Sequence, residues 1–170
     1  MTLTIWQRLD KTGRNLAPFA VTVMLVLIGL VPVPMPGYAP VAPYLTAIAI
    51  YYWAIHRPDL MRPGTSFLIG LLQDLLTGGP LGVNALLLVM VHWTVMTQRR
   101  VLQASTFTMM WLGFALVMLG VACVQWLAFM ALNATVLPFN PALFQALLTM
   151  ACFPAVAWLL IRVHRAFLQG

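Results

Sequence analysis

The segment from Phe67 to Leu88, FLIGLLQDLLTGGPLGVNALLL, decides the interpretation of the whole chain, because it places a carboxyl group inside an apolar run. Asp74 is one of only three acidic residues in the sequence, and a Gly-Gly-Pro turn follows it closely. An ionised carboxylate at the centre of a membrane helix costs on the order of 3 kcal/mol on insertion scales. The acid therefore requires a hydrogen-bonding partner, or it stays protonated.

The composition indicates an integral membrane protein. Of the 170 residues, 62% are hydrophobic and only 7% are charged, whereas a soluble domain carries roughly 25% charged residues. The net charge is +6, but the cations stand in small groups between apolar segments. That arrangement is typical of orientation in a lipid bilayer. It argues against a nucleic-acid partner, because a nucleic-acid-binding surface gathers its cations on one face.

Six apolar segments are candidate membrane spans. A spanning helix needs roughly 17–25 predominantly apolar residues, and the candidates cover approximately residues 16–33, 40–55, 64–78, 82–98, 106–132 and 142–161. The third and fourth are short and form a tight hairpin through the turn at residues 78–82. We therefore predict an all-α fold, a polytopic six-helix transmembrane bundle in which residues 1–170 make a single transmembrane domain.

The basic residues predict the orientation of this bundle. Lys and Arg occur before the first span, between the second and third, between the fourth and fifth, and after the sixth, and the other three connections contain neither. By the positive-inside rule, both termini lie in the cytoplasm. The first span is followed by several prolines and no clean small-x-small site, so we interpret it as an uncleaved anchor and not as a signal peptide.

Two segments outside the spans carry local predictions. The proline-rich stretch from Pro32 to Pro43 cannot continue a regular helix. We expect it to form an extended, partly polyproline-like connection at the outer surface. The first dozen residues mix Ile5, Trp6 and Leu9 with charged residues, a pattern that fits either a short interfacial helix or a frayed tail.

The third span is amphipathic although it lies in the membrane. On a helix its small and polar residues share one face: Ser66, Gly70, Gln73, Asp74 and Thr77. The other side is apolar: Leu68, Ile69, Leu71, Leu72, Leu75 and Leu76. The small and polar face must contact protein, because lipid cannot satisfy it.

Asp74 has several candidate partners across the turn. They are Asn84, His92 and the unpaired N–H groups that open the fourth helix. One interpretation is a polar clasp that locks the hairpin; the other is a proton or substrate site. The nearby backbone donors and the lack of a second membrane carboxylate favour the clasp, whose members are Gly70, Asp74, Gly78, Pro80, Gly82, Asn84 and His92.

The residue patterns of common enzymes are missing from the sequence. An intramembrane aspartyl protease needs two carboxylates, and no nucleophile elbow, phosphate-binding glycine loop or cofactor fingerprint occurs. Cys123 and Cys152 lie in apolar stretches and read as small buried hydrophobes. We therefore expect no catalysis, no cofactor and no metal site. Asp59 and Asp10 read as ordinary solvated acids, although the turn at Asp59 is a candidate docking point for a cytoplasmic partner.

Two stretches, YYWAIHRPD (Tyr51–Asp59) and GLLQDLLTGGPLGVNAL (Gly70–Leu86), follow the proline-rich connection in the sequence. In this order the chain resembles the bacterial rod shape-determining protein family MreD, in its proteobacterial form. The resemblance covers about residues 32–90. The matching positions are Tyr52, Trp53, Pro58, Gly70, Leu71, Asp74, Gly78, Pro80, Leu81, Gly82 and Asn84.

The resemblance implies a component of the cell-elongation machinery (elongasome) of the bacterial inner membrane, which supports peptidoglycan synthesis and cell shape. Family members associate with MreC, a single-span protein with a periplasmic domain, and through it with MreB, RodA and the transpeptidase partner of RodA. The family supplies no catalytic residues, so the expected function is a non-enzymatic scaffold embedded in the lipid bilayer.

A second function stays open because the family's six-helix bundle is similar to the substrate-binding subunits of energy-coupling-factor transporters. A solute-binding subunit would have an outward-open pocket near Asp74, Asn84 and His92. A scaffold would instead use small residues to pack against a partner helix. The candidates for that packing are Gly113, Gly120, Ala122, Ala151 and Ala155, together with the uncharged loops around Pro36–Pro43 and Leu137–Pro141.

Overall fold

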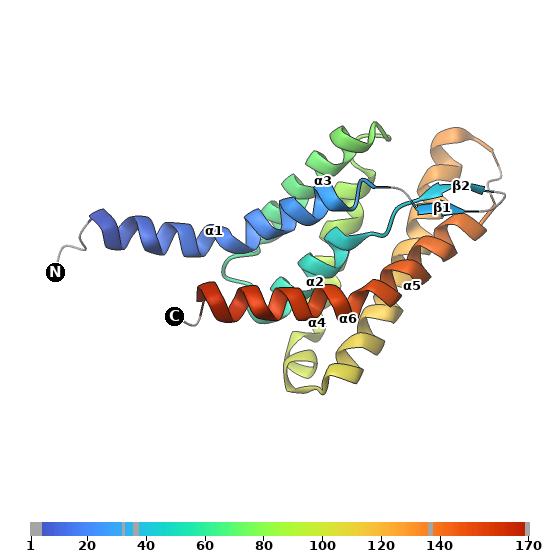
Figure 1. The fold of residues 1–170 in the computed structure, drawn as a ribbon. Coiled ribbons are helices and arrows are strands. Elements are labelled where there is room, and N and C mark those ends of the chain that lie inside the picture. Colours follow the sequence, from blue (N-terminus) through green and yellow to red (C-terminus); the bar gives the residue numbers. More distant parts are fainter. Residues whose placement is uncertain (1–4, 32, 36–37, 136–137, 169–170) are drawn as a thin grey trace.

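The computed structural model describes residues 5–31, 33–35, 38–135 and 138–168, with side chains for residues 16–31, 41–135 and 138–166. In this part of the chain, six helices and two short strands follow one another (Figure 1). They are α1 (Ile5–Ile28), β1 (Val33–Met35), β2 (Tyr38–Val41), α2 (Leu45–His56), α3 (Pro63–Thr77), α4 (Val83–Ala104), α5 (Phe107–Asn133) and α6 (Asn140–Leu168).

The predicted number of helices is confirmed, but several boundaries differ from the predicted spans. The first predicted span ends at residue 33, whereas α1 ends at Ile28 and the chain turns there. The second was predicted to begin at residue 40, whereas α2 begins at Leu45. The predicted spans were too long at these ends because hydropathy reports the apolar character of residues and not their backbone conformation. Prolines and strand residues can be as apolar as helix residues. The last helix runs beyond residue 161, so Arg162, His164 and Arg165 lie on α6 itself.

The proline-rich connection is not polyproline-like where it is described. Strands β1 and β2 pair antiparallel, with Val33 opposite Val41 and Met35 opposite Tyr38. Both elements are extended, but pairing satisfies backbone groups that a polyproline helix would leave to water. A two-stranded ribbon has only edge strands, which tolerate proline.

The start of the chain also differs from both sequence-based alternatives. Helix α1 is continuous from Ile5 to Ile28, so residues 5–15 extend the first span and form neither a separate interfacial helix nor a frayed tail. The side chains of those residues lie outside the described part of the structure.

Helix α2 is the centre of the bundle. All residues from Leu45 to Ile55 are buried, and the helix packs against α1, α4 and α6. It has 12 residues, which at 1.5 Å rise per residue give a length of roughly 18 Å. A bilayer core is roughly 30 Å thick. Helix α2 is therefore shorter than a bilayer core is thick.

Other helices satisfy both ends of α2. At its start, the backbone N–H of Tyr44 donates to Thr149 Oγ1 on α6, at 2.9 Å. At its end, the Ile55 carbonyl accepts from Arg99 Nε at 3.1 Å and from Gln103 Nε2 at 2.7 Å, both on α4. The short central helix is thus capped by side chains of its neighbours.

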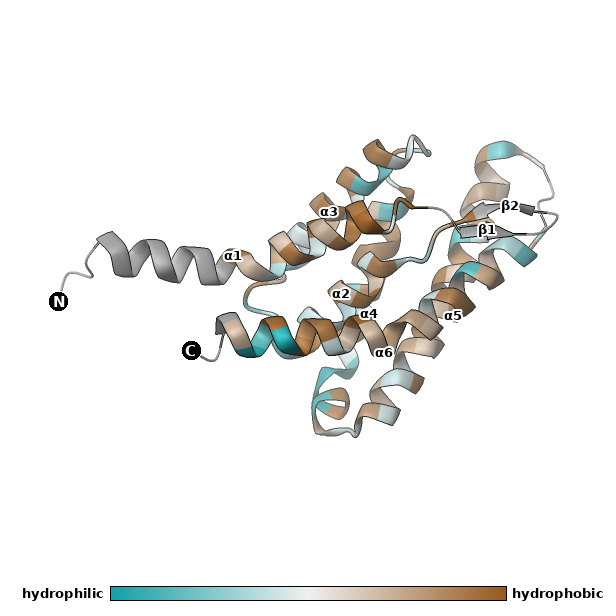
Figure 2. Ribbon diagram, viewed as in Figure 1, coloured by the Kyte–Doolittle hydropathy of each residue, from teal (hydrophilic) through white to brown (hydrophobic). Residues whose placement is uncertain are grey.

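Three segments with basic residues lie toward one end of the molecule, here called the basic end. The start of α1, the end of α6 and the α2–α3 connection lie on the left of Figure 1, the α4–α5 connection lies at the bottom, and strands β1 and β2 and the α5–α6 connection lie at the right. Apolar residues dominate the helices between the two ends, and hydrophilic residues occur near the C-terminal end of α6 (Figure 2). Two helical segments, Phe107–Asn133 and Asn140–Ala166, are long and apolar enough to cross a membrane.

We expect Thr149→Val to destabilise the bundle, because valine keeps the shape of the side chain but leaves the Tyr44 N–H without an acceptor. Leaving one buried donor unpaired costs about 1–3 kcal/mol, which lowers Tm by several degrees in a protein of this size. Thermal unfolding of the purified protein in detergent measures the change. Thr97→Val is the matched control, because Thr97 is exposed and bonds only within its own helix. Equal Tm values for the two variants would contradict the capping role.

Candidate functional site

The α3–α4 turn is built around two glycines with positive φ. Gly78 ends α3 with a φ of 67°, and its N–H donates to the Asp74 carbonyl at 3.1 Å. Gly82 precedes α4 with a φ of 99°. These left-handed conformations are costly for residues with a Cβ. The turn therefore reverses the chain in a few residues and brings the start of α4 beside the end of α3.

The carboxylate of Asp74 lies against the first turn of α4. Its Oδ2 accepts from the Gly82 N–H at 2.8 Å and from the Ala85 N–H at 3.4 Å. Its Oδ1 accepts from the backbone N–H of Asn84 at 3.1 Å and from Asn84 Nδ2 at 2.9 Å. The side chain of Asp74 is buried, with 1% of its surface exposed.

This geometry makes Asp74 the cap of a helix to which it does not belong. The first N–H groups of any α-helix lack partners within the helix, and the helix dipole favours a negative charge there. In α4 the N-cap residue is Gly82, which has no side chain to supply the acceptor. The carboxylate from α3 takes that place.

Gly70 allows the two helices to approach closely enough for these bonds. A Cβ added at Gly70 would lie 2.4 Å from Ala85 Cα, 2.7 Å from Ala85 N and 2.8 Å from the Asn84 carbonyl oxygen. All three are backbone atoms, so they can move away only if α4 itself moves. Gly70 is one turn before Asp74 on α3, and it faces the same part of α4.

His92 does not reach Asp74, although the sequence made it a candidate partner. It is buried, and its Nδ1 lies 3.4 Å from Ser66 Oγ near the start of α3. His92 follows Asn84 by eight residues, a rise of roughly 12 Å along α4. Because α3 and α4 are antiparallel, this rise places His92 at the opposite end of the hairpin from Asp74.

The predicted faces of α3 are correct for most positions and wrong for two. Ser66, Gly70 and Asp74 are buried, but Thr77 is exposed because it lies at the end of the helix. Ile69 was assigned to the apolar, lipid-facing side and is buried. Helix α3 contacts α1 as well as α4, so a second strip of its surface is covered. The fully outward positions include Leu68, Leu75 and Leu76.

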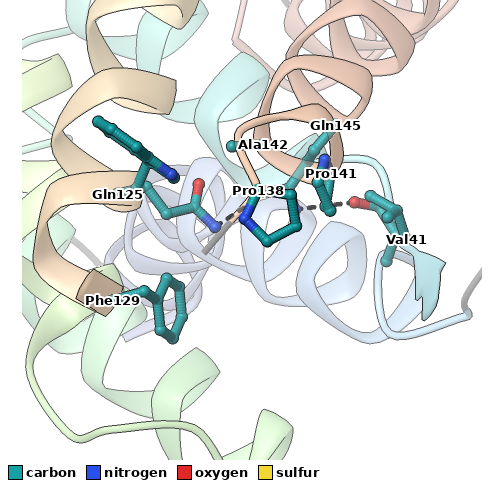
Figure 3. Close-up of a pocket in the computed structure, with 9 residues that line it drawn as sticks. Val41, Gln125, Phe129, Pro138, Pro141, Ala142 and Gln145 are labelled. Atoms are coloured by element: carbon teal, nitrogen blue, oxygen red, sulfur yellow. Dashed lines mark hydrogen bonds between the residues drawn. The ribbon is translucent and has the colours of Figure 1, made fainter. Parts of the chain in front are cut away.

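Sequence reasoning missed a cavity between β2, α5 and α6 (Figure 3). Its volume is about 380 Å³. Gln125 Nε2 donates to Gln145 Oε1 at 3.0 Å, and Gln145 Nε2 donates to the Ala42 carbonyl at 2.9 Å. The sequence signal that could have predicted this cavity is the presence of one glutamine, Gln125 or Gln145, in each of two otherwise apolar segments. The lining residues are Val41, Ala42, Gln125, Trp126, Phe129, Pro138, Pro141, Ala142 and Gln145.

A cluster of aromatic rings and histidines joins α2 to α6 at the basic end. The rings of Tyr52 and His56 stack with centroids 4.2 Å apart, and Trp53 stacks on His164 at 5.8 Å. Tyr52 Oη lies 3.4 Å from His164 Nδ1. Tyr52 and Trp53 are two of the residues that carry the family resemblance, and the structure places both against the last turns of α6.

Asp59 lies in the exposed turn between α2 and α3, as a solvated acid should. Its carboxylate forms an ion pair with Arg57 at 3.0 Å, and the hydrogen bonds from that guanidinium hold the pKa of Asp59 below its usual value. The pair is largely open to solvent and therefore adds little to stability.

We expect Gly70→Ala to weaken the hairpin, because the added methyl group would separate the α3 and α4 backbones. Forcing an extra carbon into a packed contact costs about 1–3 kcal/mol, measured as a lower Tm and a lower yield of folded protein. Gly64→Ala on the same helix is the control, since its Cβ would have no neighbour within 4 Å. Alanine favours a helix over glycine, so Gly64→Ala should be neutral or slightly stabilising. A loss of the same size in both variants would contradict the close approach.

Comparisons with known proteins identify the family of the chain. The family model described as rod shape-determining protein MreD matches residues 10–164. The rod shape-determining protein MreD of Haemophilus influenzae is 30% identical over 108 residues, which are 64% of this chain and 64% of that relative. The match thus spans just under two thirds of the relative. No solved structure matches the chain. Because the family model covers nearly the whole sequence, the chain belongs to the MreD family of rod shape-determining proteins.

Proposed function

We propose that this protein is a non-enzymatic scaffold of the rod-shape machinery in the bacterial inner membrane, where it binds MreC and supports peptidoglycan synthesis during elongation. The family membership carries the proposal. Further contacts with RodA, its transpeptidase partner and MreB would follow through MreC. The hydrogen bonds within the α3–α4 hairpin support a structural role for its polar residues over a chemical one, because both carboxylate oxygens of Asp74 accept hydrogen bonds from the start of α4.

The surface of the bundle supports a multi-pass membrane placement for the single domain. Helices α5 and α6 expose large apolar side chains along their length, among them Leu112, Leu116, Leu127, Leu147 and Leu159. A continuous apolar surface of this kind is unusual on a soluble monomer. The positive-inside rule places the basic end in the cytoplasm. Both termini then lie in the cytoplasm, and strands β1 and β2 lie on the outer side.

Asp74, Asn84 and the surrounding glycines act as the clasp in this proposal. A static platform for partners needs its own helices held in one arrangement, and the hairpin is held by charge-assisted bonds to a helix N-terminus. A solute-binding subunit would need some of these groups free for a ligand. Because Asp74 already accepts hydrogen bonds from α4 with both oxygens, the scaffold function is better supported than solute binding.

The outer end of α5 and α6 is the proposed contact with MreC. It contains the cavity of about 380 Å³. A second candidate contact surface, near the middle of the two helices, has exposed small residues that permit close helix approach. Gly120 is open, with nothing within 4 Å of its Cβ position, and Ala151 and Ala155 are exposed. Gly113 and Ala122 are interior packing residues instead, since a Cβ at Gly113 would meet Tyr51 Oη at 3.0 Å and Ala122 is buried.

We expect Asp74→Asn to lower the amount of folded protein in the membrane. The amide keeps the size of the side chain but turns one acceptor oxygen into a donor that faces backbone N–H groups. Losing charge-assisted bonds costs roughly 2–3 kcal/mol, measured by thermal unfolding and by the folded fraction in membranes. Asp59→Asn is the control, because Asp59 is exposed. Normal folding of Asp74→Asn with loss of cell shape alone would assign Asp74 to an activity and reject the clasp.

A photocrosslinking experiment in native membranes tests the scaffold proposal directly. A photoreactive residue at Phe129, which lines the cavity, or at Gly120, on the exposed face near the middle of α5, should form adducts with MreC. The same residue at Leu75, exposed on α3, is the control and should react with lipid. Absence of MreC adducts from the α5 positions would overturn the proposed contact. A rise in Tm with a vitamin-like solute would favour the transporter alternative.

A further inference from the structure

One face of α6 carries an exposed aromatic residue and two exposed arginines. Trp158, Arg162 and Arg165 follow one another at intervals of four and three residues, which places them on one side of the helix. The guanidinium of Arg162 lies over the Trp158 ring, with Cζ 4.7 Å from the ring centroid. This contact holds the arginine against the helix while leaving its N–H groups available.

These residues border an open surface space, here called the hollow, whose described lining lies entirely on α6. Together with Ile161 and Ala166 they border a space of about 630 Å³ at the basic end of the molecule. On the side toward the middle of α6, the neighbouring Leu159 and Trp158 are exposed and apolar. The hollow therefore has a cationic end and an apolar approach along the same helix.

The described carboxylates do not neutralise this charge. Asp59 is paired with Arg57 in the α2–α3 turn, and Asp74 is buried at the α3–α4 turn. Other groups near the end of α6 add positive or neutral donors, including His164, which stacks on Trp53. An anion that entered the hollow would meet two guanidinium groups with the planar geometry that suits phosphate.

We infer that Trp158, Arg162 and Arg165 bind the phosphate headgroup of an anionic membrane lipid. The inference rests on the proposed membrane placement, with the basic end in the cytoplasmic leaflet. Guanidinium groups bind phosphate through paired N–H donors, and tryptophan is enriched at the depth of the headgroups. Basic pockets on the cytoplasmic side of membrane helices suit anionic headgroups. The apolar approach along Leu159 gives the acyl chains a path that a soluble phosphate would not use.

Lipid titration of the purified chain, without MreC, tests the inference. Native mass spectrometry in neutral detergent counts bound phosphatidylglycerol, with phosphatidylcholine and inorganic phosphate as separate arms. The unsubstituted protein should retain phosphatidylglycerol in preference to phosphatidylcholine. The double variant Arg162→Gln/Arg165→Gln should lose about 30-fold in affinity, as expected from the contribution of two basic residues at an anionic surface. Trp158→Leu should lose roughly two- to fivefold through the missing cation–π contact.

The control variant is Arg62→Gln/Arg100→Gln, which removes the same charge from two other exposed positions. It should keep the affinity of the unsubstituted protein. An equal loss of affinity in both double variants would show that only the net charge of the protein matters, and it would overturn the proposed site. Displacement of phosphatidylglycerol by an equal concentration of inorganic phosphate would identify a soluble anion as the ligand and overturn the lipid assignment. Because MreC is absent, lipid binding can succeed or fail independently of the scaffold proposal.

Discussion

Backbone polar groups at helix ends must find hydrogen-bonding partners wherever an apolar environment surrounds them, and this requirement shapes the whole bundle. The first turn of α4 offers free N–H groups from Gly82, Asn84 and Ala85, and the carboxylate of Asp74 accepts all of them. The attraction works in both directions, because the buried acid also needs donors. Gly70 lets the two backbones come close enough for the bonds to form. An acid within an apolar segment is therefore explained by a helix end placed beside it.

The same constraint accounts for the surroundings of α2. This helix is too short to cross a bilayer by itself, and it is buried from Leu45 to Ile55. Its ends are capped by Thr149 from α6 and by Arg99 and Gln103 from α4. The buried ends of this short helix thus depend on longer neighbours for their hydrogen bonds. Helices α4, α5 and α6 thus form the frame in which the shorter elements are fixed.

A frame of this kind suits a protein that positions others. The polar groups of the α3–α4 hairpin are used within the chain, and what the molecule offers outward is apolar helix surface, a cavity lined with glutamines at one end and cationic side chains at the other. In the proposed function, a partner helix or periplasmic segment would contact the first two surfaces, and the headgroup region of the membrane would contact the third. Membership of the MreD family places these surfaces in the context of rod shape determination.

The sequence by itself determined the membrane class, the number of helices, the hairpin at the turn of residues 78–82 and the need of Asp74 for a partner, because hydropathy, glycine and a lone carboxyl group act locally. Only the tertiary structure decided which partner that was. The antiparallel arrangement of α3 and α4 places Asn84 and the first backbone N–H groups of α4 beside Asp74. It places His92 beside Ser66 instead. The burial of Ile69, the paired strands at the prolines, and the joining of Gln125 to Gln145 also depended on elements distant in sequence. Such contacts depend on how whole helices pack against one another. The residues next to a given position in the sequence do not reveal that packing.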